Sequence, residues 1–179
     1  MKKIILGSLF LCASTAYADR VDNVQTEGVL SSQITMTVAD ITCHINQGLG
    51  ISQQIHIPTI STNDLRTGNT KSVEVPLMVD CQASNDQPGS IAIHLVPAGV
   101  STVSGDHTIT TSLDSVGLEL AWKDTSLPAL IIGNTEFTPA QATNNVWDLS
   151  LIARPVLLAG KNVTEGNYNA SLAIKVTYY

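Results

Sequence analysis

Charged residues are scarce in this chain of 179 residues, because Asp, Glu, Lys and Arg together make up only 13%. Aromatic residues are scarcer still, at 4%. A coiled coil or a disordered polyampholyte needs far more charge, so both classes are excluded. Basic residues are also few, with 9 Lys and Arg against 15 Asp and Glu. Nucleic-acid binders carry a basic excess, so nucleic acid is excluded as a partner.

Long apolar runs are also missing. A membrane-spanning helix takes about 20 consecutive apolar residues, and no run in the sequence is that long. The run Ile4–Cys12 is too short, and it follows the basic start Met1–Lys3. Ala16–Ala18 then has the small-x-small pattern of a cleavage site. These features predict a signal peptide over residues 1–18 and export of the rest. The length allows one domain, at roughly 100–200 residues per domain.

Apolar residues at helical spacing are absent, and alternation of apolar and polar residues takes their place. The alternating segments are separated by clusters of Gly, Asn, Asp and Pro, which is typical of an all-β sandwich. A short helix is considered only for residues 138–144. The expected strands cover residues 28–38, 41–46, 51–57, 71–81, 90–96, 107–113, 116–123, 129–132, 146–158 and 168–179.

Cysteine is rare, and only Cys43 and Cys81 follow the predicted signal peptide. The strand alternation places both on apolar faces, Cys43 with Ile45 and Cys81 with Val79. In an oxidising compartment, such a pair in a small exported domain predicts a disulfide. The rival readings are a metal site and a catalytic thiol. Neither cysteine belongs to a CxxC motif or to an evident Cys–His–acid group.

The segment after the predicted signal peptide begins with polar residues, expected to be loose up to about Glu27. An alternating arm follows. The apolar phase then changes parity before Cys43, so either a bulge lies near residues 39–40 or the arm is a separate element. A free alternating arm is suited to strand addition to the sheet of another chain. One face of the arm carries Leu30, Ser32, Ile34 and Met36.

The last segment is a strand of period two that runs to Tyr179. Chain ends fray unless something holds them. An end this apolar must therefore be paired, within its own sheet or against a partner. Its apolar face carries Leu172, Ile174, Val176 and Tyr178.

The order of these features resembles a known family. A signal peptide precedes an alternating arm, and two cysteines follow, the second at the end of Lys71–Cys81. The segment Gly117–Asp124 lies in mid-chain, and Glu165–Tyr178 closes the sequence. In this order and spacing, the chain resembles a pilin subunit of the chaperone–usher class, from the fimbriae of Gram-negative bacteria.

The resemblance implies an incomplete immunoglobulin-like β-sandwich that lacks its final strand, with an N-terminal donor strand over residues 19–38 and a pilin domain over residues 39–179. A periplasmic chaperone would fill the groove beside the C-terminal strand and anchor Tyr179. At the outer-membrane usher, the arm of a neighbouring pilin would replace the chaperone. The implied donor residues are Leu30, Ser32, Ile34 and Met36, and the implied groove residues are Leu172, Ile174, Val176 and Tyr178.

One position departs from the family pattern. Many pilins have a glycine in the arm seven residues before the first cysteine, and here that position is Met36. The nearest glycine is Gly28. The register of the donor strand therefore stays open.

The function expected from the resemblance is that of a structural fimbrial subunit at the cell surface, polymerised by donor-strand exchange and supporting adhesion. The alternative is a single-domain tip adhesin or lectin for a glycan or protein receptor on a host. Trp122 and Trp147 are then either sugar platforms or core residues. An enzyme is not expected, and neither is a cofactor or a metal, because GxSxG, HExxH, P-loop and GxGxxG motifs are all missing.

Overall fold

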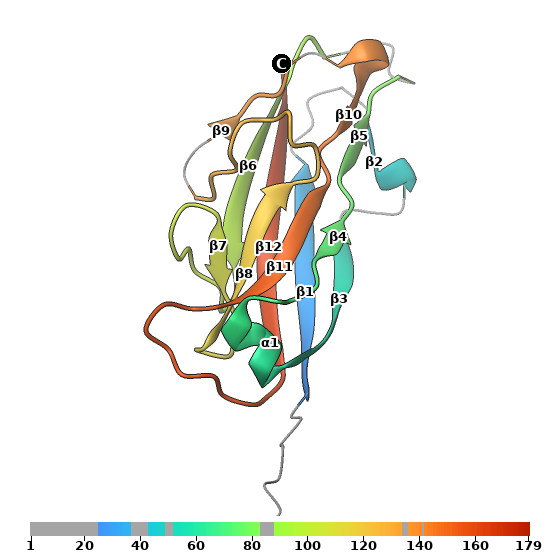
Figure 1. Ribbon diagram of the computed structural model, residues 1–179. Coiled ribbons are helices and arrows are strands. Elements are labelled where there is room, and N and C mark those ends of the chain that lie inside the picture. Colours follow the sequence, from blue (N-terminus) through green and yellow to red (C-terminus); the bar gives the residue numbers. More distant parts are fainter. Residues whose placement is uncertain (1–24, 37–42, 49–51, 83–87, 134–135, 141) are drawn as a thin grey trace, which may run out of the picture.

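The computed structural model describes residues 25–36, 43–48, 52–82, 88–133, 136–140 and 142–179, and in them two layers of β-sheet face each other (Figure 1). The architecture is that of the all-β sandwich predicted from the alternation of apolar and polar residues. The strands are β1 Gln25–Met36, β2 His44–Ile45, β3 Ser52–Ser61, β4 Val73–Val75, β5 Met78–Asp80, β6 Ile91–Ala98, β7 Thr108–Thr110, β8 Val116–Trp122, β9 Glu136–Phe137, β10 Val146–Asp148, β11 Leu151–Leu157 and β12 Tyr168–Tyr178.

The first layer is a five-stranded sheet in the order β3-β1-β12-β6-β9. β1 runs parallel to β12 and antiparallel to β3. β12 is antiparallel to β6. The strand at the start of the described chain thus lies in the middle of this sheet, between two strands of the remaining body (Figure 1).

The second layer contains a four-stranded sheet, β4-β11-β8-β7, and a three-stranded sheet, β10-β5-β2. Two of the predicted strands are each broken in two here, at Pro76-Leu77 and at Leu149-Ser150. Side chains satisfy the backbone at the breaks. The hydroxyl of Ser150 accepts a hydrogen bond from the Leu77 N–H at 3.2 Å, and the Asn46 side chain accepts one from the Met78 N–H at 2.7 Å.

A single apolar core lies between the layers. Leu118, Leu120 and Leu151 of the second layer are fully buried, as are Ile93 and Leu95 of β6. The predicted disulfide between Cys43 and Cys81 is present at the edge of this core and joins the start of β2 to the end of β5. Both cysteines are buried, as the strand parity predicted.

The helices differ from the prediction. Helix α1, Thr62–Thr67, lies where the sequence predicted a turn. Ser61 caps it by accepting a hydrogen bond from the Asp64 N–H, and Gly68 ends it with φ of 70°. The helix considered over residues 138–144 is instead a single 3₁₀ turn, Thr143–Asn145, and a second 3₁₀ turn covers Asn46–Gly48.

Some strand boundaries also differ. The strand expected at residues 129–132 is not formed, and β9 lies after it. β1 begins at Gln25, inside the segment that was expected to be loose. The proposed bulge near residues 39–40 lies outside the described residues, but β1 and β2 belong to different sheets, so the arm is a separate element. The loop of residues 158–167, between β11 and β12, lies at the end of the sandwich where β1 begins (Figure 1).

Candidate functional site

The candidate site is the groove of the first sheet between β3 and β12, which β1 occupies. On one side, the Cα positions of Ser32 and Ile34 lie beside those of Leu172 and Ile174. On the other side, Ser32 lies beside Gln53 of β3. If β1 were removed, both β3 and β12 would lose a row of backbone partners, and an unpaired edge is prone to aggregation.

The floor of the groove is the apolar face of β12. Its inward residues Ala170, Leu172, Ile174 and Val176 are all fully buried. Tyr178 is only half-buried, and Lys175 on the opposite face is exposed. The sequence therefore identified the inward face of this strand correctly.

The arm itself is β1. Among its residues the side chains of Gly28, Ser31 and Ser32 are described. Gly28 and Ser32 are buried and Ser31 is half-exposed, so the two even-numbered residues among these three face the core. The backbone register places Leu30 beside Ala170, and Met36 beside Val176. The side chains of Leu30, Ile34 and Met36 lie outside the described part of the structure.

Gly28 is a residue of the site that the sequence left without a role. Its Cα is paired with that of Tyr168, and a Cβ added at Gly28 would overlap the outer part of the Tyr168 ring. Tyr168 is itself only 2% exposed, so the ring has little room to move aside. Residues 25–36 contain no other glycine, which is the sequence signal that could have found this contact.

Three hydroxyl groups at the groove are buried without a hydrogen-bond partner among the described residues: Ser32 Oγ, Tyr168 OH and Tyr178 OH. Burial disfavours a charged phenolate. It therefore raises the pKa of Tyr168 well above its ordinary value, and it raises the pKa of Tyr178 to about 12. The groove therefore combines an apolar floor with three buried hydroxyl groups, one on β1 and two on β12, that have no hydrogen-bond partner among the described residues.

Tyr179 follows β12, and its backbone is held by the segment before β6. The Tyr179 carbonyl accepts a hydrogen bond from the Gly89 N–H at 2.8 Å, and the Tyr179 N–H donates one to the Ser90 carbonyl at 3.0 Å. The Tyr179 side chain is 63% exposed. This end of the strand is therefore tied down, as its apolar pattern required.

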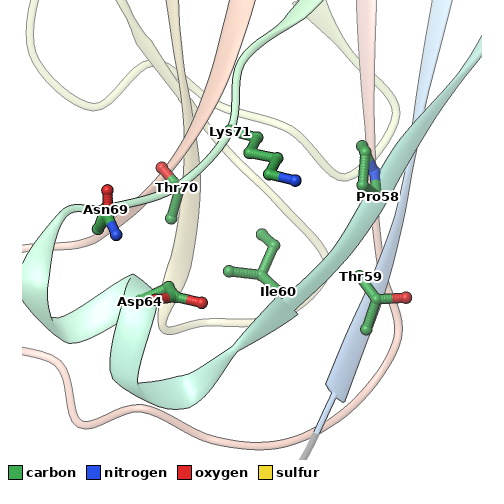
Figure 2. A pocket seen from close by; sticks show the side chains of 7 residues that line it. All are labelled: Pro58, Thr59, Ile60, Asp64, Asn69, Thr70 and Lys71. Atoms are coloured by element: carbon green, nitrogen blue, oxygen red, sulfur yellow. The ribbon is translucent and has the colours of Figure 1, made fainter.

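A hollow outside the groove shows no comparable apolar surface. It has a volume of about 340 Å³ and lies beside α1. Figure 2 shows Lys71 extending from one wall of it and Asp64 on α1. The Asp64 carboxylate is engaged by the Ser61 hydroxyl at 2.6 Å. The lining is mixed and contains no aromatic side chain: it comprises Pro58, Thr59, Ile60, Asp64, Asn69, Thr70 and Lys71.

The two tryptophans belong to the core. Trp122 is 6% exposed and packs against Phe137 with ring centroids 5.1 Å apart. Trp147 is 3% exposed, and its Nε1 donates a hydrogen bond to the Ala140 carbonyl at 3.2 Å. Neither ring presents an open face as a sugar platform.

Among the described residues, no group of three or more His, Cys, Asp and Glu side chains is arranged to hold a metal ion. The same part of the chain contains no helix that is both long and apolar enough to cross a membrane.

Comparisons with known proteins agree with this geometry. The sequence profile of the family described as "Fimbrial protein" matches residues 32–179. Protein FanH of Escherichia coli is 24% identical over 148 residues, which cover 81% of this chain and 83% of FanH.

Two solved structures share the fold. The crystal structure of the P pilus rod subunit PapA superposes with a TM-score of 0.53 at 17% identity, over 76% of this chain and 99% of PapA. A chain from the structure of a chaperone–usher pilus that reveals the molecular basis of rod uncoiling superposes with a TM-score of 0.61, also at 17% identity, over 80% of this chain and 91% of that one.

These pilin folds are immunoglobulin-like sandwiches that lack a strand, and here the body formed by β2–β12 has its gap between β3 and β12. β1, the N-terminal arm, lies in that gap. The match over most of the chain leads to one conclusion: the chain belongs to the fimbrial protein family.

Proposed function

We propose that this subunit polymerises by donor-strand exchange, with the arm of one copy filling the β3–β12 groove of the next. The observation that carries the proposal is the position of β1, which pairs with β12 on one side and β3 on the other. A segment that fits this groove from its own chain has the length and alternation to fit the same groove in a second copy.

The energetic argument supports a requirement for an occupant. Burying an aliphatic side chain contributes roughly 1.5–3 kcal/mol. Leu172, Ile174 and Val176 all belong to the groove floor. Partial exposure of this row, together with two unpaired backbone edges, would consume much of the roughly 5–15 kcal/mol that stabilises a typical domain. Folding of the body and occupation of the groove are therefore coupled.

The partners follow from this coupling. In the periplasm a chaperone supplies the strand and contacts the end of β12 at Tyr179, and at the outer-membrane usher the arm of the neighbouring subunit displaces it. The finished fimbrium lies at the cell surface, where it supports adhesion. No bond is formed or broken in this exchange, so the proposed role needs no catalytic group.

The test replaces residues 25–36 by a Gly/Ser segment of equal length, which keeps the predicted cleavage site but lacks the alternation and strand propensity of the arm. In cells that make the fimbriae, we expect the variant to co-purify with the chaperone but not to occupy a neighbour's groove. Replacement of residues 21–24 alone is the matched control and leaves incorporation unchanged. Incorporation of the 25–36 variant as a donor at the normal level would refute the proposal.

A further inference from the structure

The outer edge of β3 has no strand beside it in the part of the chain that the structure describes. β3 is the last strand of the first sheet, and its inner edge pairs with β1. An edge strand presents a row of unpaired N–H and C=O groups, which is a template for pairing with another chain. This edge lies on the opposite side of β3 from the β3–β12 groove, so an inference about it goes beyond the proposed function.

The second layer also ends on this side of the sandwich. Among the described strands, β4 is the last of its sheet, and it lies on the same side as β3 in Figure 1. The Gln53 side chain spans the two layers and donates a hydrogen bond to the Pro76 carbonyl at 2.9 Å. Ile55 and Val73 pack against the core here but stay partly exposed. Free strand edges and incompletely covered apolar side chains therefore occur together.

A hollow of about 380 Å³ opens between β3 and the break that separates β4 from β5. Its apolar wall is formed by Ile55, Pro76 and Met78, and the rest of its lining consists of Asn and Gln residues. Asn46 is only 7% exposed and holds this wall in place, because its side chain donates to the Pro76 carbonyl at 3.1 Å and accepts from the Met78 N–H at 2.7 Å. The lining contains no charged residue, so the hollow suits an uncharged apolar side chain.

The hollow beside α1 lies further along the same strand, between residues 58–60 of β3 and residues 69–71. The Asp64 carboxylate in it accepts a hydrogen bond from the Ser61 hydroxyl at 2.6 Å. The Lys71 ammonium has no ion-pair partner among the described residues, and Figure 2 shows its side chain extending toward β3. An acidic side chain would complement Lys71, so this second hollow suits Asp or Glu.

The spacing of the two hollows fits one extended segment. Ile55 lines the first hollow and Ile60 lines the second. On the inner edge of β3 these two residues lie beside Leu30 and Thr26, which are four residues apart on β1. Side chains four residues apart on a strand lie on the same face, about 13 Å from each other at ~3.3 Å per residue. A strand along the outer edge would direct one side chain toward each hollow.

The edge is also protected against unselective pairing. Pro58 has no N–H to donate, and the register between β3 and β1 shifts close to it. Prolines and bulges at a sheet edge reduce aggregation. A regular ladder with a partner is therefore limited to residues 52–57, and the two hollows provide the selectivity for its side chains.

We propose that the outer edge of β3 binds an extended segment of a partner protein by antiparallel strand addition. The segment pairs with residues 52–57 and places an apolar residue against Ile55, Pro76 and Met78. Four residues before this apolar residue, an Asp or Glu of the segment forms an ion pair with Lys71. β3 then has a strand on each side, the arm on its inner edge and the partner segment on its outer edge.

The first test titrates the purified mature chain with a labelled, capped peptide, Thr-Glu-Thr-Ser-Thr-Val-Thr-Ser-Thr, and with versions that carry Ile or Leu in place of Val. Fluorescence anisotropy measures binding. We expect K71E to weaken binding about fivefold and to prefer a version of the peptide with Lys in place of Glu. K161E makes the same charge change in the loop after β11 and is the matched control, with unchanged affinities. Absence of binding by all three peptides, or an unchanged affinity of K71E, would overturn the proposal.

The second test asks whether the peptide pairs through its backbone. Only alternate N–H groups of a strand point toward a given neighbour, so N-methylation can be placed on either set. Methyl groups on the set that faces β3 are expected to abolish binding, whereas methyl groups on the other set leave it largely unchanged. Equal binding of the two methylated peptides would contradict strand addition.

A second copy of this chain is the rival occupant, because two outer edges of β3 could pair about a two-fold axis. Sedimentation of the purified chain with and without the peptide separates the two cases. A monomer that binds the peptide supports a partner segment, whereas a dimer that the peptide dissociates would assign the edge to a second copy and overturn the proposal. None of these measurements involves fimbriae, so their outcome is independent of the donor role of the arm.

Discussion

At the scale of single residues, odd or even position along a strand determines which side chains face the core. A few contacts between distant residues are not visible in this alternation. Alternation alone identified the inward face of β12, because a strand places every second side chain on the same side. It could not identify Tyr168 as the partner of Gly28, since that contact joins residues far apart in the chain. Nor could it show that the Ser32 hydroxyl has no hydrogen-bond partner among the described residues.

Substitution of Gly28 by alanine is expected to weaken closure of the groove, because the new Cβ meets the buried Tyr168 ring. Overpacking of this kind typically costs 1–3 kcal/mol, i.e. about 2 kcal/mol here. Urea unfolding of the monomer measures the loss. G89A is the matched control, because the nearest atom to its added Cβ is the Tyr179 carbonyl oxygen at 3.7 Å, an ordinary contact. The double variant G28A/Y168L should regain part of the stability, and an unchanged midpoint for G28A would contradict the register.

Alkaline pH is expected to destabilise the monomer through the groove tyrosines. Burial raises the pKa of Tyr178 from 10.0 to about 12 and also raises the pKa of Tyr168. The unfolded chain releases these protons first, so the associated stability is complete below about pH 10 and is lost as the pH rises toward 12. Unfolding free energies measured from pH 8 to 12 should fall less steeply for Y178F than for the unmodified chain. Equal slopes would count against burial of this phenol.

At the scale of elements, the sequence predicted where most strands lie but not where they break. The strands expected at 71–81 and 146–158 are each split. At the first break, the side chains of Ser150 and Asn46 accept hydrogen bonds from the N–H groups of Leu77 and Met78. Such long-range side-chain bonds have no local signal. Helix α1 did have one, since Ser61 and Asp64 form a capping pair and Gly68 ends the helix. The helix was missed because Asn63 and Asp64 are also typical turn residues.

The disulfide is expected to act at this scale by holding β2 against β5 and by fixing the point from which the arm departs. Replacing both cysteines by alanine should lower the unfolding free energy by about 2–5 kcal/mol. Thermal unfolding with and without the bond measures this loss. A double variant as stable as the unmodified chain would show that the bond contributes little to the folded state.

At the scale of the whole molecule, the feature that links the fold to the proposed function is the groove between β3 and β12. Without β1, the described body of β2–β12 has a gap in its first layer, between β3 and β12. The sequence predicted this gap only through its resemblance to pilins, because an absent strand has no sequence pattern of its own. It predicted an occupant from another chain. The structure places the arm of the same chain there, paired with β12 on one side and β3 on the other.

The body with residues 25–36 replaced by Gly/Ser is expected to be unstable alone and to be rescued by the free 25–36 peptide. A ligand that binds only the folded state stabilises it by about 2.7 kcal/mol at a hundredfold excess over its Kd. Thermal melts at increasing peptide concentration measure the effect, with a scrambled peptide as the control. A melting temperature that is insensitive to the peptide would contradict an open groove in this variant.

The exposed loop of residues 158–167 has a practical consequence for imaging. It leaves the sandwich between β11 and β12 (Figure 1), and Gly160, the third residue of the loop, has a φ of 74°. Gly160 is exposed, so an epitope inserted after it would be accessible to gold-labelled antibodies. A tag fused at Tyr179 would instead follow a residue whose backbone is hydrogen-bonded to Gly89 and Ser90. Electron micrographs of cells carrying such an insertion could then locate individual copies along a fibre.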